Sequence, residues 1–209
     1  MLHASDLVIA TRNAGKAAEL AAIVGDAFGA CRSLADVSSD NFEPDETGRT
    51  FRDNACLKAS AYAKRLGCHV LADDSGLAVD ALGGRPGVFS ARFAAMHGAG
   101  KGDADNNALL LRQLDAIPDD RRGARFVCVL AISSPSGRIL FTSEGDVRGV
   151  ILRNPRGDNG FGYDPLFLIP SLGKTTAELS PSAKAAISHR GIAGRRLGEL
   201  LRRHGRRAG

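Results

Sequence analysis

Two adjacent carboxylates, Asp73 and Asp74, are the first residues whose type and spacing suggest chemistry. They follow a short apolar run, 70–72, that is typical of a buried strand, and they precede a Ser-Gly pair that is typical of a turn. Carboxylates at the end of a strand often hold a metal ion or a water molecule, and neighbouring anions are tolerated when they are exposed or share a cation. An exposed Asp-Asp-Ser-Gly turn is the alternative, and this stretch alone favours neither interpretation.

A second candidate site is the sequence TRNAGK at 11–16. It follows an apolar run at 7–10 and precedes an Ala/Leu-rich stretch at 17–24, so we expect a strand, a turn and a helix in that order. Free N–H groups at the start of a helix, with Lys16 beside them, favour an anion such as phosphate. The segment is not a Walker loop, and a surface pair between Lys16 and Glu19 is the alternative explanation of the lysine.

A helix is predicted between Thr50, which can cap its N-terminus, and Gly67. Its apolar face comprises Phe51, Ala55, Ala59, Tyr62, Ala63 and Leu66. Asn54 and Lys58 lie four residues apart on a different, polar side of this helix. We interpret both as solvated residues unless that side faces Asp74, in which case a lysine there would suit a phosphate.

A glycine-rich segment with aromatic residues, 154–170, is the third candidate. Gly160 and Gly162 flank Phe161, and glycines beside an exposed ring let the backbone approach a flat ligand. An aromatic face next to a carboxylate, here Asp164, is what a purine base would use. Aromatic side chains packed into the core are the alternative.

The elements that must position these residues indicate an α/β protein with a mixed sheet. Further expected elements are a helix capped by Asp103 or Asp105 and ending near Leu114, strands at 125–133, 138–143 and 146–152, and helices after Ser180-Pro181 and over 192–204, interrupted at 188–191. The first two of these strands flank a Ser-Pro-Ser-Gly turn and therefore predict a hairpin.

The composition is that of an ordinary globular protein, with 44% hydrophobic and 24% charged residues. A chain of 209 residues can form one domain or two lobes with a sizeable core. No apolar run approaches the roughly 20 residues that cross a bilayer, and the N-terminus lacks a signal-peptide pattern, so we expect a cytoplasmic protein. The 4 cysteines are far apart, and we expect reduced thiols with no zinc site.

The net charge of +5 comes from the C-terminal end, 195–209, whereas the rest of the chain is formally neutral. A nucleic-acid-binding protein that uses this arginine-rich end is one hypothesis. The end has no interleaved aromatic residues, which favours a solvated terminus instead.

Taken together, these stretches resemble the inosine triphosphate pyrophosphatase family, the XTP/dITP diphosphatases. The matching motifs are TRNAGK at 11–16, ETG-TF-NA--KA at 46–59, ADDSGLAVDALGGRPGVFSARFA at 72–94, GFGYDP at 160–165, KT-AEL at 174–179 and K----SHRG at 184–191. The resemblance covers residues 7 to about 200. One departure is Arg12, where the family often has glycine, and the arginine-rich end lies outside the family pattern.

The resemblance implies hydrolysis of ITP, dITP, XTP and dXTP to the nucleoside monophosphate and pyrophosphate. It also implies Mg²⁺ as cofactor and a homodimer, with no nucleic acid and no membrane as partner. The implied fold is an elongated mixed β-sheet flanked by helices, with two lobes around a central active-site cleft. We expect a single domain over 1–209, with a core at about 7–200 and a basic tail at 201–209.

The family's site residues carry over onto matching positions of this chain. Asp74 is implied to bind Mg²⁺ and to activate the attacking water, with Glu46 and Asp73 as further metal-side carboxylates. Substrate binding is implied for Thr11, Arg12, Asn13, Ala14, Gly15, Lys16, Lys58, Ser75, Phe161, Gly162, Tyr163, Asp164, Lys184, His189 and Arg190.

The implied base-side residues suit a 6-oxopurine. Hypoxanthine and xanthine present an N–H donor beside a 6-oxo acceptor, which a carboxylate next to cationic donors complements. Adenine reverses both groups and would leave buried polar atoms unsatisfied. A related pyrophosphatase with a modified-pyrimidine preference is the alternative.

Overall fold

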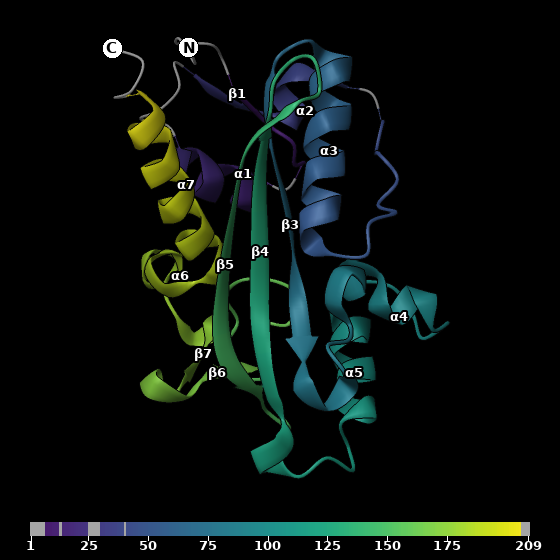
Figure 1. Ribbon diagram of the computed structural model, residues 1–209. Helices are drawn as coiled ribbons and strands as arrows, with labels where there is room; N and C mark the ends of the chain where they lie inside the picture. The colour runs from purple at the N-terminus through teal and green to yellow at the C-terminus, as the bar shows by residue number, and fades with distance from the viewer. Residues whose placement is uncertain (1–6, 13, 25–29, 40, 206–209) are drawn as a thin grey trace. The chain divides into compact units, whose positions relative to one another are not determined.

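The computed structural model describes residues 7–12, 14–24, 30–39 and 41–205 (Figure 1). Seven strands form a sheet in the order β2-β1-β3-β4-β5-β6-β7. They are β1 (Leu7–Ile9), β2 (Cys31–Ser33), β3 (His69–Val79), β4 (Gly123–Ser133), β5 (Ile139–Ile151), β6 (Phe167–Ile169) and β7 (Lys174–Thr175). Strand β1 pairs in parallel with β2 and β3, whereas β6 pairs antiparallel with β5 and β7, so the sheet is mixed, as predicted.

Helices separate the first four strands along the chain and two more helices follow β7, which confirms the α/β class. The α-helices are α1 (Ala14–Val24), α2 (Leu34–Val37), α3 (Phe51–Leu66), α4 (Phe93–Met96), α5 (Asp103–Gln113), α6 (Pro181–Ile187) and α7 (His189–Gly205). Short 3₁₀ segments lie at 80–82, 87–92, 119–121, 170–172 and 176–178. None of the helices in the described ranges is long and apolar enough to cross a membrane.

The chain divides into two compact units. Unit 1 comprises Met1–Asp74, Cys128–Gly145 and His189–Gly209, and unit 2 comprises Ser75–Val127 and Asp146–Ser188. Strands β3, β4 and β5 each begin in one unit and end in the other. This division is compatible with one domain or with two lobes, so the domain boundaries stay a prediction.

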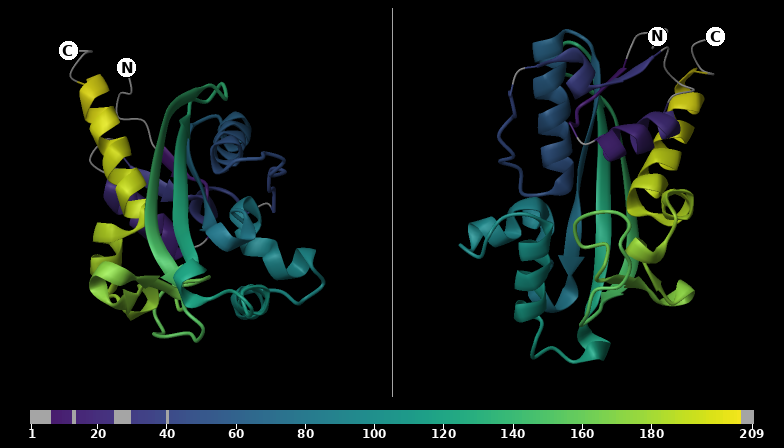
Figure 2. Two further views of the ribbon diagram at one scale, coloured as in Figure 1. Left: turned by 60° about the horizontal axis from the view of Figure 1, so that its bottom comes forward. Right: turned by 180° about the vertical axis from the view of Figure 1, so that it is seen from behind.

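Unit 1 has a core on each face of its strands, because successive strand residues point to opposite faces. The residues packed with α1 and α7 are Leu7, Ile9, Leu20, Val24, Leu71, Cys128, Leu130, Ile132, Ala193, Leu197 and Leu201. The residues packed with α3 on the other face are Val8, Ala55, Ala59, Tyr62, Ala63, Val70, Ala72, Val129 and Ala131. Figures 1 and 2 show α1 and α7 on one side of these strands and α3 on the other.

Unit 2 has a separate core around α5. Its largest buried members include Leu77, Phe93, Leu110, Leu114, Phe126, Tyr163 and Phe167. Arg122 is also buried there, and its guanidinium donates to the carbonyl oxygens of Leu114, Ile151 and Leu152. These bonds join the end of α5 to the end of β5.

Helix α3 begins and ends where its local signals predict. Thr50 Oγ1 accepts a hydrogen bond from Asp53 N, and the Asp53 carboxylate accepts one from Thr50 N, which makes a capping box. At the other end Gly67 adopts the left-handed conformation, with φ of 64°, that favours glycine.

The predicted Ser-Gly turn after Asp74 is wrong, because β3 continues through Ser75 and Gly76 to Val79. A Cβ on Gly76 would lie 2.3 Å from Ser90 Oγ, so the glycine permits a close approach rather than a turn.

Strand β5 is also longer than predicted, because the segments expected at 138–143 and 146–152 form one strand. A Cβ on Gly145 would lie 2.3 Å from the His189 carbonyl oxygen, so this glycine also permits a close approach. Helix α7 begins at His189 rather than Ile192, and α1 begins at Ala14 rather than Ala17.

Candidate functional site

The two carboxylates in the middle of β3 point to opposite faces of the strand. Asp73 shares a face with Leu71, which packs with α1 and α7, and Asp74 shares a face with Ala72, which packs with α3. Their exposed fractions are 6% and 7%, so the interpretation as an exposed turn is wrong. Ser75, the next residue of the same strand, is half-buried.

On the α3 face, Asp74 belongs to a group of three charged residues that we call the acid–lysine cluster: Glu46, Lys58 and Asp74. Lys58 Nζ donates to Asp74 Oδ1 at 2.9 Å and to Glu46 Oε1 at 3.0 Å. Burial lowers the pKa of Lys58, but the nearby carboxylates more than offset this effect and raise the pKa above its usual value. Burial raises the pKa of Asp74, and Lys58 offsets this effect only in part. The cluster therefore contains one protonated lysine and two carboxyl groups, Glu46 and Asp74.

Asn54 lies beside the acid–lysine cluster and is fully buried, so the polar side of α3 faces Asp74, which is the alternative to two solvated residues. Its Oδ1 accepts a hydrogen bond of 2.8 Å from Gly48 N, in the loop that carries Glu46. A Cβ on Gly48 would lie 2.5 Å from this oxygen, which explains the glycine of the ETG motif. Asn54 Nδ2 and Asp74 Oδ2 are both buried, and neither makes a hydrogen bond of ordinary geometry to any residue that the structure describes. The Asn54 side chain is nevertheless near enough to lower the pKa of Asp74, an effect that is smaller than those of burial and Lys58.

The chemistry of Asp74 and Glu46 fits Mg²⁺, which prefers hard oxygen ligands. Asp74 Oδ2 is a buried acceptor that has no partner in the described part of the chain. Within the same ranges, no group of three or more His, Cys, Asp or Glu side chains could hold a metal ion. Mg²⁺ commonly uses one or two carboxylates and completes its coordination with water and substrate phosphate, so a pair of carboxylates suffices.

On the opposite face, Asp73 is paired with two cations from different helices. Its Oδ2 lies 3.5 Å from Lys16 Nζ of α1 and 3.7 Å from Arg190 Nη2 of α7. Arg190 and its neighbour His189 are 2% and 7% exposed. Asp73 and Asp74 thus have different nearest cations, because strand alternation separates them.

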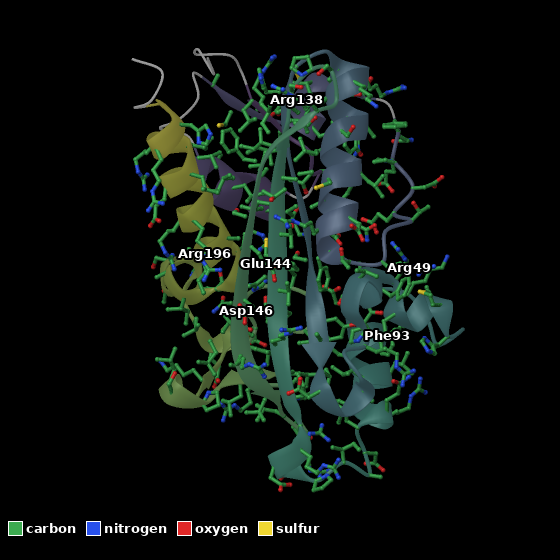
Figure 3. All side chains as sticks on the ribbon, viewed as in Figure 1. Arg49, Phe93, Arg138, Glu144, Asp146 and Arg196 are labelled. Carbon is green, nitrogen blue, oxygen red and sulfur yellow. The ribbon has the colours of Figure 1, made fainter. Side chains whose placement is uncertain are left out.

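Helix α7 is tied to β5 close to these residues. Ser143 Oγ donates to the Ala193 carbonyl oxygen at 2.8 Å, and Arg196 Nη1 donates to the Glu144 carbonyl oxygen at 2.6 Å. Figure 3 labels Arg196 and Glu144, which lie next to each other. These bonds fix the helix whose first residues are His189 and Arg190.

The TRNAGK segment leads from β1 into α1, with Lys16 in the first turn of the helix. Thr11 and Arg12 help to line a pocket of about 360 Å³ between β1, α1, β2 and α2, and Arg12 Nη1 donates to the Ser38 carbonyl oxygen at 3.4 Å. Asn13 and the Ala14 side chain lie outside the described residues. The segment expected to bind phosphate therefore borders an open pocket.

Four of the predicted residues, Phe161, Gly162, Tyr163 and Asp164, lie in a loop of unit 2 at 160–164, which we call the aromatic loop, and Lys184 lies in α6 of the same unit. Asp164 Oδ2 accepts hydrogen bonds from Phe161 N at 2.8 Å and from Lys184 Nζ at 2.5 Å. Its Oδ1 accepts a bond of 2.8 Å from Thr176 Oγ1. Sequence reasoning missed Thr176, which occupies the unspecified position of the KT-AEL motif, because nothing local shows where its hydroxyl points.

The two aromatic residues of this loop have different environments. Phe161 is 40% exposed, and Lys184 Nζ lies 4.9 Å from the centre of its ring. Tyr163 is 4% exposed and donates from its hydroxyl to the Ser90 carbonyl oxygen. The structure therefore places one ring at the surface and the other in the core.

Gly160 is required where the aromatic loop turns back on Asp164. A Cβ there would lie 2.1 Å from Asp164 Oδ2, and φ is +81°. This contact accounts for the first glycine of the GFGYDP motif.

Known proteins are similar in sequence to this chain over nearly its whole length. The dITP/XTP pyrophosphatase of Exiguobacterium sibiricum is 54% identical over 195 residues, which cover 93% of this chain and 96% of that protein. The dITP/XTP pyrophosphatase of Geobacillus kaustophilus is 52% identical over 194 residues, which cover 93% of each.

Solved structures show the same fold. The Staphylococcus aureus Ham1 protein matches with a TM-score of 0.83 and 41% identity over 95% of this chain and 99% of that one. A dITP/XTP pyrophosphatase from Mycobacterium abscessus matches with a TM-score of 0.72 and 47% identity, over 94% of this chain and 98% of that one. The model of the Ham1 family matches residues 7–200. This chain therefore belongs to the Ham1 family.

Proposed function

We propose that this protein hydrolyses the non-standard purine nucleotides ITP, dITP, XTP and dXTP to the nucleoside monophosphate and pyrophosphate. Relatives about half identical to it, over nearly their whole length, are named dITP/XTP pyrophosphatase. The observation that carries the proposal within this chain is Asp74, a buried carboxylate with one oxygen on Lys58 and the other unbonded in the described part of the chain. Such an oxygen has the capacity to bind a metal ion or to accept a proton from water.

We propose Mg²⁺ as the cofactor, with Asp74 and Glu46 as its protein ligands. When bound, the ion neutralises charge on the phosphate oxygens and orients them. Asp74 accepts the proton of the attacking water, and Lys58, whose pKa is raised, contributes a permanent positive charge to the phosphates. Most of the barrier to this reaction falls through positioning and charge neutralisation rather than covalent catalysis.

We propose that the TRNAGK segment binds the phosphates of the substrate. The N–H groups at the start of α1 and the ammonium group of Lys16 favour an anion there. The resemblance adds Asn13 to them. Because Asp73 pairs with Lys16 and Arg190, we propose that it orients these two cations rather than binding the metal ion.

For the base, we propose that Phe161 stacks on the purine and that Asp164 and Lys184 contact its 6-oxo edge. The resemblance adds His189 and Arg190 to these residues. Asp164 already accepts three hydrogen bonds from the protein. A carboxylate has about four acceptor positions, so one remains for the ring N–H of a 6-oxopurine. Lys184 donates to the 6-oxo group, and adenine offers the opposite pair of groups.

The test is pyrophosphate release from dITP, XTP, dGTP, dATP and a modified pyrimidine triphosphate, with Mg²⁺ and with EDTA. We expect metal-dependent release from dITP and XTP, with the monophosphate as the other product. Inorganic phosphate with a diphosphate product would mean that a different bond is cleaved. Preference for the pyrimidine, or no hydrolysis of any purine, would overturn the proposed substrate class.

We also propose that the protein is a cytoplasmic homodimer, as the resemblance and composition imply. Two large apolar side chains of unit 2, Phe89 and Met96, are 41% and 54% exposed, which would suit a contact with a second copy. Light scattering coupled to size exclusion tests this assembly, and a monomer mass at all concentrations would contradict it.

A further inference from the structure

Helix α5 binds the aromatic loop through both backbone polar groups of one residue. Asp103 Oδ2 accepts a hydrogen bond of 2.7 Å from Gly162 N, and Asn107 Nδ2 donates one of 2.9 Å to the Gly162 carbonyl oxygen. Asp103 and Asn107 are four residues apart, so they lie on the same face of the helix. Together they form a clamp on Gly162, the residue that separates Phe161 from Tyr163.

Helix capping does not account for Asp103. The prediction that Asp103 or Asp105 caps α5 is wrong, because Gly102 occupies the cap position and makes no side-chain bond. Asp105 accepts a hydrogen bond of 2.7 Å from Lys101 N, a local contact in the same turn. Asp103 instead reaches a residue 59 positions later in the chain.

The side-chain amide of Asn107 makes one described hydrogen bond, which is the bond to Gly162. Its Oδ1 is buried and makes no hydrogen bond to the residues that the structure describes, whereas its Nδ2 bonds to Gly162. A buried acceptor without a partner is costly. The contact with Gly162 is the only hydrogen bond described for this side chain that offsets the cost.

The helix that carries the clamp is itself fixed within unit 2. Leu109 and Leu110 are buried in the core. Asn106 Oδ1 accepts a hydrogen bond of 2.8 Å from Ala94 N, and Arg122 binds the Leu114 carbonyl oxygen at the far end. Helix α5 (Figure 1) thus offers a rigid support for a loop that has little apolar burial of its own on the Phe161 side.

We propose that Asp103 and Asn107 are positioning residues for purine binding. They hold Gly162 in the positive φ of 62° that the turn requires, while Asp164 holds the Phe161 N–H on the other side. The exposed ring is then set for stacking before the substrate arrives, and binding costs less ordering of the loop. This inference rests on the proposed function, because it assigns the clamp to the purine-binding residues.

The first experiment compares Asp103→Ala with Asp105→Ala as a matched control. Both variants remove one carboxylate from the first turn of α5 and its interaction with the helix dipole. Only Asp103→Ala removes the bond to Gly162. We expect KM for dITP to rise about 10-fold in Asp103→Ala with kcat within about twofold, whereas the control keeps both values. An equal effect in both variants would overturn the proposal.

Two further experiments, a conservative substitution and a double-mutant cycle, distinguish a positioning role of Asp103 from a merely structural one. Asp103→Asn keeps an oxygen that can accept from Gly162 N, so it should recover most of the KM. In a Phe161→Ala background, Asp103→Ala should raise KM no further, because the clamp acts through the ring. Fully additive effects would contradict the proposal. If Asp103→Ala does not fold, Asn107→Ala takes its place in the same cycle.

Hydrogen exchange separates failure of this inference from failure of the proposed function. Asp103→Ala should accelerate exchange of the amides at 160–164 in the protein without substrate, and Asp105→Ala should not. Unchanged exchange would overturn the clamp whatever the enzyme hydrolyses. Faster exchange in a protein that releases no pyrophosphate from any purine would refute the proposed function and with it the assignment to purine binding.

Discussion

Asp74 in unit 1 and Asp164 in unit 2 are both buried carboxylates bound by a lysine, but their remaining acceptor atoms differ. Asp74 has Oδ1 on Lys58, and its Oδ2 bonds to none of the described residues. Asp164 has Thr176 on Oδ1, and Phe161 N and Lys184 on Oδ2. Asp74 therefore keeps one acceptor oxygen that the described protein residues do not use. Asp164 has most of its acceptor positions occupied by protein donors.

The difference indicates two uses of the same functional group. A buried polar atom without a partner costs about 1 to 3 kcal/mol, and a ligand that supplies the partner offsets this cost. Burial raises the pKa of Asp74, which suits a group that must accept a proton. Asp164 instead fixes the aromatic loop and Lys184 with three hydrogen bonds, and one acceptor position remains for the base.

The largest expected effect comes from Asp74→Asn. We expect kcat to fall about 10³-fold, because the amide neither accepts the proton of water nor binds Mg²⁺ as a carboxylate does. The melting temperature should stay close to that of the wild type, because burial disfavours the ionised carboxylate that is removed and Lys58 keeps Glu46 as a partner. Pyrophosphate release and circular dichroism measure both, with the exposed Asp119→Asn as a control. Activity near the wild-type level would remove Asp74 from its role.

For Asp164→Asn we expect the larger effect on stability and the smaller effect on catalysis. Loss of the charge leaves Lys184 buried without its carboxylate, which costs about 3 to 5 kcal/mol of folding free energy for a broken buried pair. The preference for ITP over ATP should fall about 10-fold, because one side of the base-recognition pair is altered. Chemical denaturation and competition between the two substrates measure these changes. A variant as stable as the wild type would refute the view that Asp164 mainly fixes shape.

The pH dependence tests the ionisation of Asp74 without a substitution. Because burial raises its pKa above the ordinary value of 3.8, the ionised form is lost at a higher pH than for an exposed aspartate. At a Mg²⁺ concentration too low to saturate the free enzyme, kcat/KM should decrease by about tenfold per pH unit as pH falls through that raised pKa. Saturating Mg²⁺ should move the decrease to lower pH, because a bound cation favours the ionised carboxylate. The pKa of Lys58 is raised above 10.5, so deprotonation of this lysine sets no limit near neutral pH. A profile that stays flat down to the ordinary aspartate pKa, in a protein still folded by circular dichroism, would contradict this assignment.

The smallest expected effect is that of Gly48→Ala. The added Cβ would lie 2.5 Å from Asn54 Oδ1 and 2.6 Å from Asp53 Cβ, so the loop that carries Glu46 must move away from α3. We expect kcat to fall about fivefold, with a loss of about 1 to 3 kcal/mol in stability. In an Asn54→Ala background the same substitution should cost less, because the contact with Asn54 Oδ1 is gone while those with Asp53 Cβ and Asn54 N remain. An equal loss in both backgrounds would show that the collision is not the cause.

Local signals were sufficient for much of this protein. Thr50 and Gly67 delimit α3, and the turn at 134–137 joins β4 to β5. These features depend on hydrogen bonds between residues a few positions apart, which propensity and capping rules describe. The motifs, through their resemblance to a family, also named the charged residues that the acid–lysine cluster contains.

Contacts between distant segments were beyond local signals. Nothing near Gly76 shows that Ser90 approaches it, so the strand was predicted to end too early, and the separation of Asp73 from Asp74 was missed. The bonds from Thr176 to Asp164 and from Asp103 to Gly162 likewise join separate elements. Residue order specifies where a carboxylate can occur, but its partners depend on how strands and helices pack, because packing alone brings remote side chains within hydrogen-bonding distance.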